Sequence, residues 1–254
     1  MTVAHVESRD TGVAVLDRAM AVLGAVENGA RSFTEVVSAT GLSRTTAHRL
    51  LRSLVDYELV AIRDGSGYRL GPRLLRFADG ALHEVPLRDV AHPFLERLAA
   101  TTGESAQLYV RSATERVCID AVESDRELRT IVSVGATLPL TAGSAGKVFL
   151  AFDDLGPAAD RLIDQASAST PATPLGADLR RQLAPIRRRG WASSAGERQT
   201  GVGSVSAPIF GPDGELLAAI SVSGPQARLG RTTARRYAPA VVRTAQEIRA
   251  ALSA

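Results

Sequence analysis

Residues 41–54 read GLSRTTAHRLLRSL, a glycine turn followed by a short amphipathic helix. Ser43 stands where a helix cap accepts a backbone N–H bond. Apolar side chains then recur at the i, i+3, i+4, i+7 spacing of one buried stripe: Ala47, Leu50, Leu51 and Leu54. The pattern predicts a helix that buries its leucine face in a small core.

The opposite stripe of this helix is polar: Thr45, His48, Arg49 and Arg52, beside Arg44. No acidic residue occurs in the helix before Asp56, so the stripe offers positive charge and hydrogen-bond donors. Such a face suits a helix that lies in the major groove of DNA. An amphipathic surface helix with a solvated basic face is the alternative interpretation.

The residues before this helix favour the DNA-binding interpretation. In SFTEVVSATGLS, Ser32 and Glu35 have the spacing of a capping box, and Gly41 is a turn residue. A helix, a glycine turn and a second helix form a helix-turn-helix pattern. A further helix is expected upstream, ending near Asn28-Gly29, with one apolar stripe: Leu16, Ala19, Met20, Leu23 and Val26.

Two β-prone runs follow the recognition helix. LVAIR and YRLG flank the turn residues 64–67, which predicts a β-hairpin and hence a winged helix-turn-helix. Arg63, Ser66 and Arg69 on this wing are candidates for phosphate or minor-groove contacts, although ordinary solvated turn residues would give the same pattern. The residues predicted to contact DNA are Ser32, Thr34, Ser43, Arg44, Thr45, Thr46, His48, Arg49, Arg52, Arg63 and Arg69.

The composition limits the class of protein. With 254 residues, of which 45% are hydrophobic, the chain is long enough for one or two packed domains. The formal charge is only +3, so binding to a polyanion would depend on a local patch. Lys147 is the only lysine, and almost all positive charge is therefore on arginine, a bias that a GC-rich genome also produces.

Several kinds of site and location are not expected. Cys118 is the only cysteine, which excludes an internal disulfide and a cysteine-rich zinc site, and its apolar run predicts a buried structural thiol. No run approaches the roughly 18 apolar residues of a membrane-spanning helix, and residues 1–10 lack the core of a signal peptide. We expect a cytoplasmic protein that does not contact the membrane.

The first domain boundary is expected after the wing. Pro72 suits the first turn of a helix in which Leu74, Leu75, Ala78 and Leu82 share one face. The predicted organisation is a winged helix-turn-helix domain over residues 11–71, a linker helix over 72–86 and a second domain over 87–254. This second domain begins with a helical pattern over residues 87–102 that contains Pro93, a residue that either kinks the helix or displaces its start.

Strand-like runs dominate the chain from residue 104 onward. ESAQLYVRS, ERVCIDAVES and LRTIVSVGA predict three strands, and WASSA, GSVSAPIF and LLAAISVSG predict three more. Helices are expected over residues 144–152, 158–165, 177–189 and 232–251, the third interrupted by Pro185 and the last with Pro239 as a possible bend. Strands and helices do not alternate regularly, so we predict an α+β domain with a mainly antiparallel sheet.

The most distinctive stretch is GWASSAGERQTGVGSVSAPIFG, residues 190–211. With LPLTAGSAGKVFLAF (138–152) and AAISVSGP (218–225), it resembles the IclR family of bacterial transcriptional regulators, and the resemblance covers residues 11–253. The family signature is matched at Gly190, Ser194, Glu197, Ser204, Val205, Ser206, Ile209 and Phe210. Gly211 stands where the signature ends in an acidic or amide residue. Because this position is expected in a turn, the departure affects the geometry of the turn more than the function.

The resemblance implies a winged helix-turn-helix joined to a GAF-like ligand-binding domain. It places the effector contacts at Ser144, Ala145, Ser194, Val202, Ser204, Ser221 and Ser223. Backbone N–H groups at a helix start favour an anion, and nearby hydroxyls can complete its hydrogen bonds, so we expect a small organic acid or a derivative. Alternatively, these small residues serve only to let helices pack closely on a sheet.

The sequence is compatible with three functions. The favoured one is a sequence-specific regulator that binds double-stranded operator DNA as a homodimer or a dimer of dimers and responds to a small effector. A constitutive architectural DNA-binding protein would leave the second domain without a role. An enzyme is disfavoured because GSAGK lacks the rest of a phosphate-binding loop and no nucleophile elbow or HExxH motif occurs, so no catalytic residue, metal site or cofactor is predicted.

Overall fold

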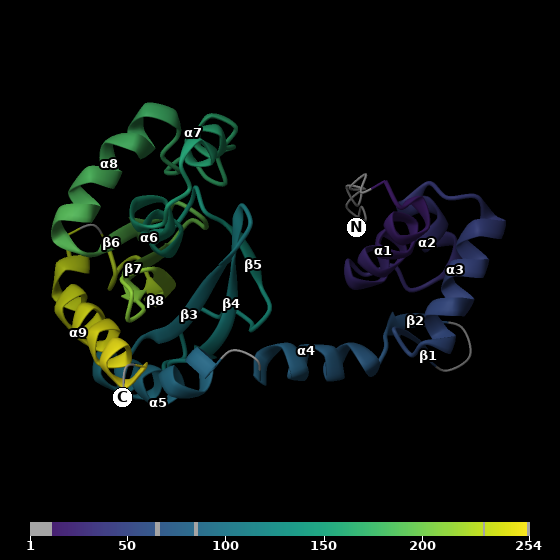
Figure 1. The fold of residues 1–254 in the computed structure, drawn as a ribbon, viewed down its shortest axis with the longest axis horizontal. Helices are drawn as coiled ribbons and strands as arrows, with labels where there is room; N and C mark the ends of the chain where they lie inside the picture. Colours follow the sequence, from purple (N-terminus) through teal and green to yellow (C-terminus); the bar gives the residue numbers. More distant parts are fainter. Residues whose placement is uncertain (1–11, 64–66, 84–85, 231, 253–254) are drawn as a thin grey trace. The chain divides into compact units, whose positions relative to one another are not determined.

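A computed structural model describes residues 12–63, 67–83, 86–230 and 232–252 (Figure 1). The chain divides into two compact units, residues 1–84 and 85–254. The first is a small helical unit with one hairpin, and the second is built around a six-stranded sheet. In the described residues, no helix has the length and apolar character needed to cross a membrane.

The first unit begins with three helices, and their ends are set by local sequence. Helix α1 spans Ala14–Glu27, α2 spans Phe33–Thr40 and α3 spans Arg44–Asp56. The predicted capping box is present, because the Ser32 hydroxyl accepts from the Glu35 N–H and the Glu35 carboxylate accepts from the Ser32 N–H. The Arg31 N–H also donates to this carboxylate, and the two backbone hydrogen bonds, that from Arg31 first, lower the pKa of Glu35. Gly41 ends α2 in the left-handed conformation, at φ 66°.

The core of the first unit confirms one predicted stripe and corrects another. Helix α3 buries all four predicted residues: Ala47, Leu50, Leu51 and Leu54. In α1, however, the predicted Leu16 and Met20 are more than half exposed. Of the predicted stripe, Val26 is buried, and Ala19 and Leu23 are partly buried against the core. The other buried residues of α1 were not predicted: Ala21, Val22 and Ala25. Apolar residues thus occur on more than one face of α1, and the face packed against the unit's core includes only part of the predicted stripe.

The wing follows α3 as predicted. Strand β1 (Val60–Arg63) pairs antiparallel with β2 (Gly67–Leu70), which completes the winged helix-turn-helix. The turn at residues 64–66, including Ser66, lies outside the described residues. Helix α4 (Arg73–His83) comes next, and its Leu75 side chain is 74% exposed within this unit.

The second unit contains a six-stranded antiparallel sheet. Its strands are β3 (Ser105–Ser112), β4 (Glu115–Val122), β5 (Thr137–Pro139), β6 (Ala192–Ala195), β7 (Val202–Phe210) and β8 (Leu216–Pro225). Their order across the sheet is β5-β4-β3-β8-β7-β6. The central pair β3 and β8 joins two halves that are far apart in sequence, since Gln107 lies opposite Ser221. This confirms the predicted α+β fold.

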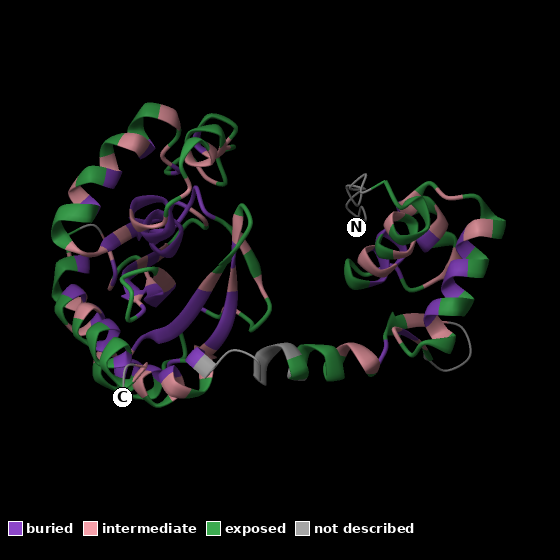
Figure 2. Cartoon of the chain, viewed as in Figure 1, coloured by how far each residue is buried: buried purple, intermediate pink, exposed green. Residues whose placement is uncertain are grey.

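Helices cover the sheet. They are α5 (Pro86–Thr102), α6 (Ser144–Phe152), α7 (Pro157–Asp164), α8 (Gly176–Arg189) and α9 (Ala234–Leu252). Helices α5 and α9 lie side by side and pack on the sheet, whereas α6 packs on β6, β7 and β8 and is itself covered by α8. Almost all of α6 is buried, as Figure 2 shows. Pro185 does not interrupt α8, contrary to the prediction, since the carbonyl that loses its partner belongs to the exposed Arg181.

The predicted strand at residues 128–136 is wrong. This segment contains no strand, and the next strand is the short β5. Its large apolar side chains Leu128, Ile131 and Val134 recur every third residue and are exposed, so they do not form the one-sided face of a pleated strand. Gly135 then turns the chain at φ 88°, and its N–H donates to the Cys118 carbonyl at 2.7 Å.

The buried α3 stripe yields a stability prediction. Leu51→Ala should lower the free energy of unfolding of the first unit by about 2–5 kcal/mol, because it removes a fully buried side chain and leaves a cavity. Urea denaturation monitored by circular dichroism measures the change. Ser53→Ala, an exposed position on the same helix, is the control and should change stability by less than about 0.5 kcal/mol. Equal effects of both substitutions would contradict the burial of this stripe.

Candidate functional site

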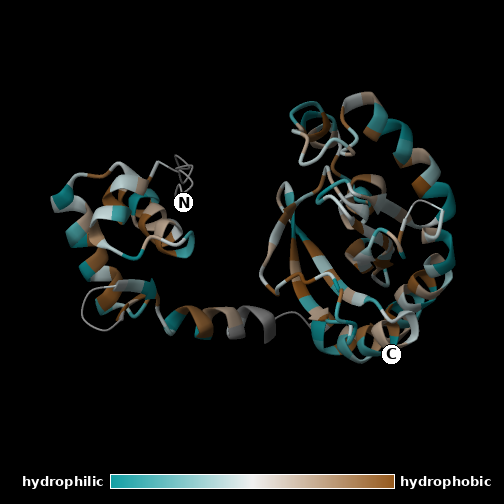
Figure 3. Ribbon diagram, turned by 180° about the vertical axis from the view of Figure 1, so that it is seen from behind, coloured by the Kyte–Doolittle hydropathy of each residue, from teal (hydrophilic) through white to brown (hydrophobic). Residues whose placement is uncertain are grey.

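The polar face of α3 is presented to solvent. Arg44, Thr45, His48, Arg49 and Arg52 are all exposed, while the leucine face of the same helix is buried. Hydrophilic and hydrophobic residues therefore alternate along α3 in Figure 3. In the part of the chain that the structure describes, no carboxylate lies within 4 Å of the three arginines of this face, whose guanidinium groups are available to a polyanion.

Phe33 on α2 fixes two side chains of this face. The Arg44 guanidinium lies 4.9 Å from the centre of the Phe33 ring, and the His48 ring meets the same ring edge-on at 6.2 Å. A cation over an aromatic face is held by the ring quadrupole. The two helices of the motif thus order donors that would otherwise lose side-chain entropy on binding.

The remaining predicted DNA-contacting residues lie around α3. The Ser32 and Ser43 hydroxyls both cap helices, and the Ser43 hydroxyl also donates to Thr46 Oγ1 at 2.9 Å. Thr34 at the start of α2 and Arg69 on β2 are exposed. Arg63 belongs to β1, but its side chain lies outside the described residues. The contribution of each residue to DNA binding stays a prediction.

The second candidate site is a cavity between the start of α6 and the sheet. All seven predicted effector residues line it: Ser144, Ala145, Ser194, Val202, Ser204, Ser221 and Ser223. They come from α6, β6, β7 and β8, so the topology brings together segments separated by up to 79 positions in sequence. The cavity volume is about 30 Å³, enough for about two water molecules.

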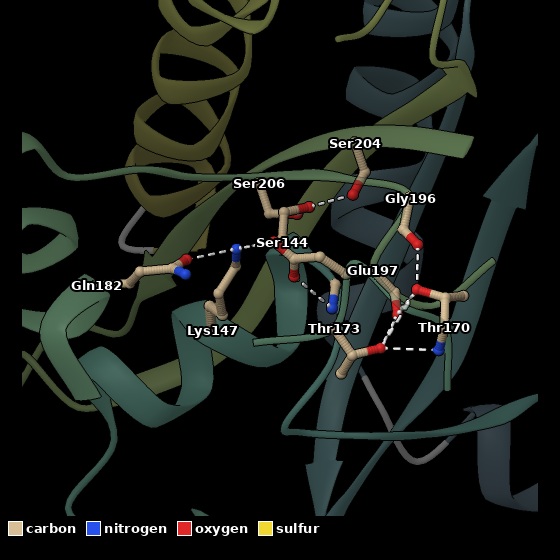
Figure 4. Close-up of polar contacts among 10 residues, drawn as sticks. Ser144, Lys147, Thr170, Thr173, Gln182, Gly196, Glu197, Ser204 and Ser206 are labelled. Atoms are coloured by element: carbon tan, nitrogen blue, oxygen red, sulfur yellow. Dashed lines mark hydrogen bonds and ion pairs between the residues drawn. The ribbon is translucent and has the colours of Figure 1, made fainter. Parts of the chain in front are cut away.

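Serine hydroxyls on one side of the cavity bond to one another. Ser144 Oγ lies 2.6 Å from both Ser204 Oγ and Ser206 Oγ (Figure 4). Ser206 Oγ in turn donates to Ser221 Oγ at 2.9 Å. Ser223 Oγ donates to the side-chain oxygen of Gln107 at 2.9 Å. A ligand with hydroxyl or carboxylate groups can replace these mutual bonds at little cost in unsatisfied polar groups.

A buried ion pair holds the start of α6 in place. Lys147 Nζ donates to Glu197 Oε1 at 2.5 Å and to Gln182 Oε1 at 2.9 Å (Figure 4). The other carboxylate oxygen of Glu197 accepts from the Gly143 N–H at 3.2 Å. Thr170 and Thr173 donate to the Glu197 carbonyl, so both the side chain and the backbone of Glu197 are fixed.

Six further residues line the cavity and were not predicted: Tyr109, Arg116, Val132, Gly143, Arg198 and Gln199. Arg116 is 3% exposed, and burial lowers its pKa to about 10. A sequence signal for it existed, since an arginine within the apolar run RVCIDAV is unusual in a strand buried on both sides. Cys118, from the same run, is buried as predicted, and burial raises its pKa to about 12. Within the described residues, no cluster of metal-ligating side chains occurs.

Comparison with known families identifies the two units. A helix-turn-helix domain model of the IclR family matches residues 15–62, and the model of the bacterial transcriptional regulator IclR C-terminal domain matches residues 79–250. The chain belongs to the IclR family of bacterial transcriptional regulators. This confirms the resemblance inferred from residues 190–211 and the prediction of a DNA-binding regulator under effector control.

Individual IclR relatives match over most of their length. The glycerol operon regulatory protein of Streptomyces griseus is 32% identical over 217 residues, which is 84% of this chain and 85% of that protein. The transcriptional repressor IclR of Escherichia coli is 29% identical over 231 residues, covering 88% and 84% of the two chains. A solved IclR homologue of Microbacterium hydrocarbonoxydans, complexed with 4-hydroxybenzoate, is 25% identical with a TM-score of 0.80 and covers 94% of this chain and 99% of that one.

The Lys147–Glu197 pair supports a prediction of stability. Glu197→Gln should lower the free energy of unfolding by about 3–5 kcal/mol, because Lys147 keeps its charge in the interior while losing its carboxylate partner. The double variant Lys147→Met/Glu197→Gln should recover most of this loss, since the charge is gone and the amide oxygen still accepts from Gly143. Chemical denaturation of the full chain measures both. A double variant as unstable as the single one would show that the charge is not the cause.

Proposed function

We propose that the polar face of α3 reads operator bases and that the residues around it bind the phosphate backbone. The observation that supports this assignment is the exposed row of Arg44, His48, Arg49 and Arg52, two of which are held in place by Phe33. Arginine can bind guanine with two parallel hydrogen bonds, which gives a base-specific contact. The cap hydroxyls of Ser32 and Ser43 and the side chains of Thr34, Thr45, Thr46, Arg63 and Arg69 are assigned to the backbone contacts.

We also propose that the serine-lined cavity is the effector site and that the effector is a small organic acid or a derivative. The cavity combines hydroxyls with the N-terminal end of α6, where backbone N–H groups and the helix dipole favour an anion. A homologue crystallised with 4-hydroxybenzoate is consistent with this class of ligand. In this proposal the second unit acts by binding and not by catalysis.

The functional form is proposed to be a homodimer or a dimer of dimers. One recognition helix contacts only a few base pairs, so a single copy would discriminate poorly among sites in a genome. Two copies on a palindromic operator double the number of base contacts, with half-sites spaced by the helical repeat of DNA. Effector binding then changes operator affinity by favouring one arrangement of the paired modules.

Substitutions on α3 test the assignment to base recognition. Arg49→Ala should weaken binding to DNA from upstream of the protein's own gene by about 1–3 kcal/mol and should reduce the preference over random DNA. Arg243→Ala, an exposed arginine of the second unit, is the matched control and should leave both affinities unchanged. Fluorescence anisotropy at fixed salt gives both values. Equal losses on operator and random DNA would reassign Arg49 to the phosphates, and no loss on either would remove α3 as the recognition helix.

Substitutions in the cavity test the effector site. Ser204→Leu and Ser221→Leu each fill the cavity and remove a hydroxyl, so each should lower the affinity for an effector identified from a panel of small organic acids at least tenfold. Operator binding by the unliganded protein should persist, because these residues belong to the second unit. Calorimetric titration and gel shifts on the full chain measure the two properties. Normal effector binding by both variants would place the site elsewhere.

A further inference from the structure

Arg116 is an unusual residue for the wall of a small cavity. It lies on β4, is 3% exposed, and its Nε atom has no hydrogen-bond partner. Nη1 donates to the Pro139 carbonyl, and the guanidinium lies 5.5 Å from the centre of the Tyr109 ring. These are weak substitutes for the water that a guanidinium loses on burial, because neither neutralises its charge.

No carboxylate compensates this charge. Among the described residues, no acidic oxygen lies within 4 Å of Arg116 or of Arg198, the second arginine on the cavity wall. Glu197 is the acidic residue whose charge acts on Arg116, but its two oxygens already serve Lys147 and the Gly143 N–H. Burial, with a smaller contribution from the like charge of Arg198, lowers the pKa of Arg116 to about 10, so the group is still cationic at neutral pH.

The first turn of α6 adds to the positive potential. A Cβ atom on Gly146 would lie 2.6 Å from Arg116 Nη1, and one on Gly143 would lie 3.0 Å from Nη2. The two glycines therefore leave the space in which the guanidinium lies directly against the N-terminal end of α6. That end carries the positive pole of the helix dipole, which would repel a guanidinium unless an anion lay between or beside them.

We propose that the cavity, widened beyond its volume of about 30 Å³ by movement of the side chains that line it, binds a small organic dianion. One anionic group pairs with Arg116 and Arg198, while the serine hydroxyls and the start of α6 hold the other. This rests on the proposed function, in which the cavity is the effector site. Two carboxylates, or a carboxylate and a phosphate, supply the required charge. A planar guanidinium binds either group through two parallel hydrogen bonds, and the free Nε of Arg116 becomes one of the donors.

Net charge distinguishes organic dianions from the two other ligand classes considered, monoanions and neutral polyols. A monoanion would balance only one of the two positive charges of Arg116 and Arg198, and a neutral polyol would balance neither. The imbalance is costly because Arg116, at 3% exposed, is shielded from water. The hydroxyl side of the cavity accepts any of the three classes. Selectivity therefore comes from Arg116 and Arg198, which the serine pattern alone does not reveal.

Calorimetric titration of the full-length protein with matched probes tests the proposal. Malonate, succinate and phosphoglycolate are compared with acetate and with the uncharged malonamide, at constant ionic strength to hold screening fixed. At least one dianion should bind at least tenfold more tightly than acetate and malonamide. A preference for malonate or succinate identifies a dicarboxylate, and a preference for phosphoglycolate identifies a phosphorylated acid. The highest ligand concentration is set at roughly 10 mM, which is enough to detect weak, millimolar binding. If none of the dianions binds at that concentration, the proposal is wrong.

Variants locate the binding and guard against unfolding. Arg198→Gln should weaken the preferred dianion at least tenfold, and Arg243→Gln, the exposed control, should not change it. Arg116→Met should abolish binding but leave the melting temperature of the unliganded protein unchanged or higher, since a buried uncompensated charge has been removed. Dianion binding that is unaffected by Arg198→Gln and Arg116→Met would overturn the proposal.

Operator affinity distinguishes this inference from the proposed function. If a dianion binds through the two arginines but leaves operator affinity unchanged, the dianion site stands and the regulatory role of the cavity fails. If instead a neutral or monoanionic compound alters operator affinity in wild type and in both arginine variants alike, the regulatory role stands and the dianion proposal is overturned. The same anisotropy titration, with and without each probe, reports both outcomes.

Discussion

The second unit depends on the buried pair of Lys147 and Glu197. Lys147 is 1% exposed, and a charge so placed is tolerated only with a carboxylate at hydrogen-bond distance and further partners around it. Through the Gly143 N–H, the same carboxylate fixes the residue before α6. The first turn of α6 is thereby held over β7 and β8, and the cavity forms between them. The pair is thus worth more as a positional constraint than as a source of net stability.

Residues with local roles were the ones that could be predicted from sequence. The cap at Ser43, the box of Ser32 with Glu35 and the buried stripe of α3 all depend on spacings of three or four residues, which a sequence displays directly. The seven residues predicted to bind the effector lie at one cavity for a different reason, since resemblance to a family carries the fold's long-range contacts with it. Helix α1 was predicted only in part because apolar residues occur on more than one of its faces, and only packing decides which of them are buried.

Arg116 and Arg198 could not be predicted in this way. Neither belongs to the matched signature positions. Arg116 reaches the cavity only because β4 lies across the sheet from β7 and β8, with β3 between, whereas Arg198 lies in the segment that joins β6 to β7. The prediction of a strand over residues 128–136 was wrong for a related reason. The apolar residues of this segment resembled a strand, but the outer edge of β4 is paired instead with β5 and by the Gly135 N–H. Which segment pairs with the edge of a sheet depends on the whole sheet, so neither the sequence of β5 nor that of residues 128–136 determines it alone.

The charged residues around the cavity add a selectivity that its serines alone do not provide. The Glu197 carboxylate pairs with Lys147, whereas Arg116 and Arg198 have no carboxylate within 4 Å among the described residues. Hydroxyls alone would make the site permissive, because a serine can donate to or accept from almost any polar group. The uncompensated arginines make it discriminating, since the free energy of an occupied cavity then depends mainly on the ligand's charge. In the proposed function, family membership accounts for the position of the effector site, and two arginines outside the matched signature positions, Arg116 and Arg198, select the effector by its charge.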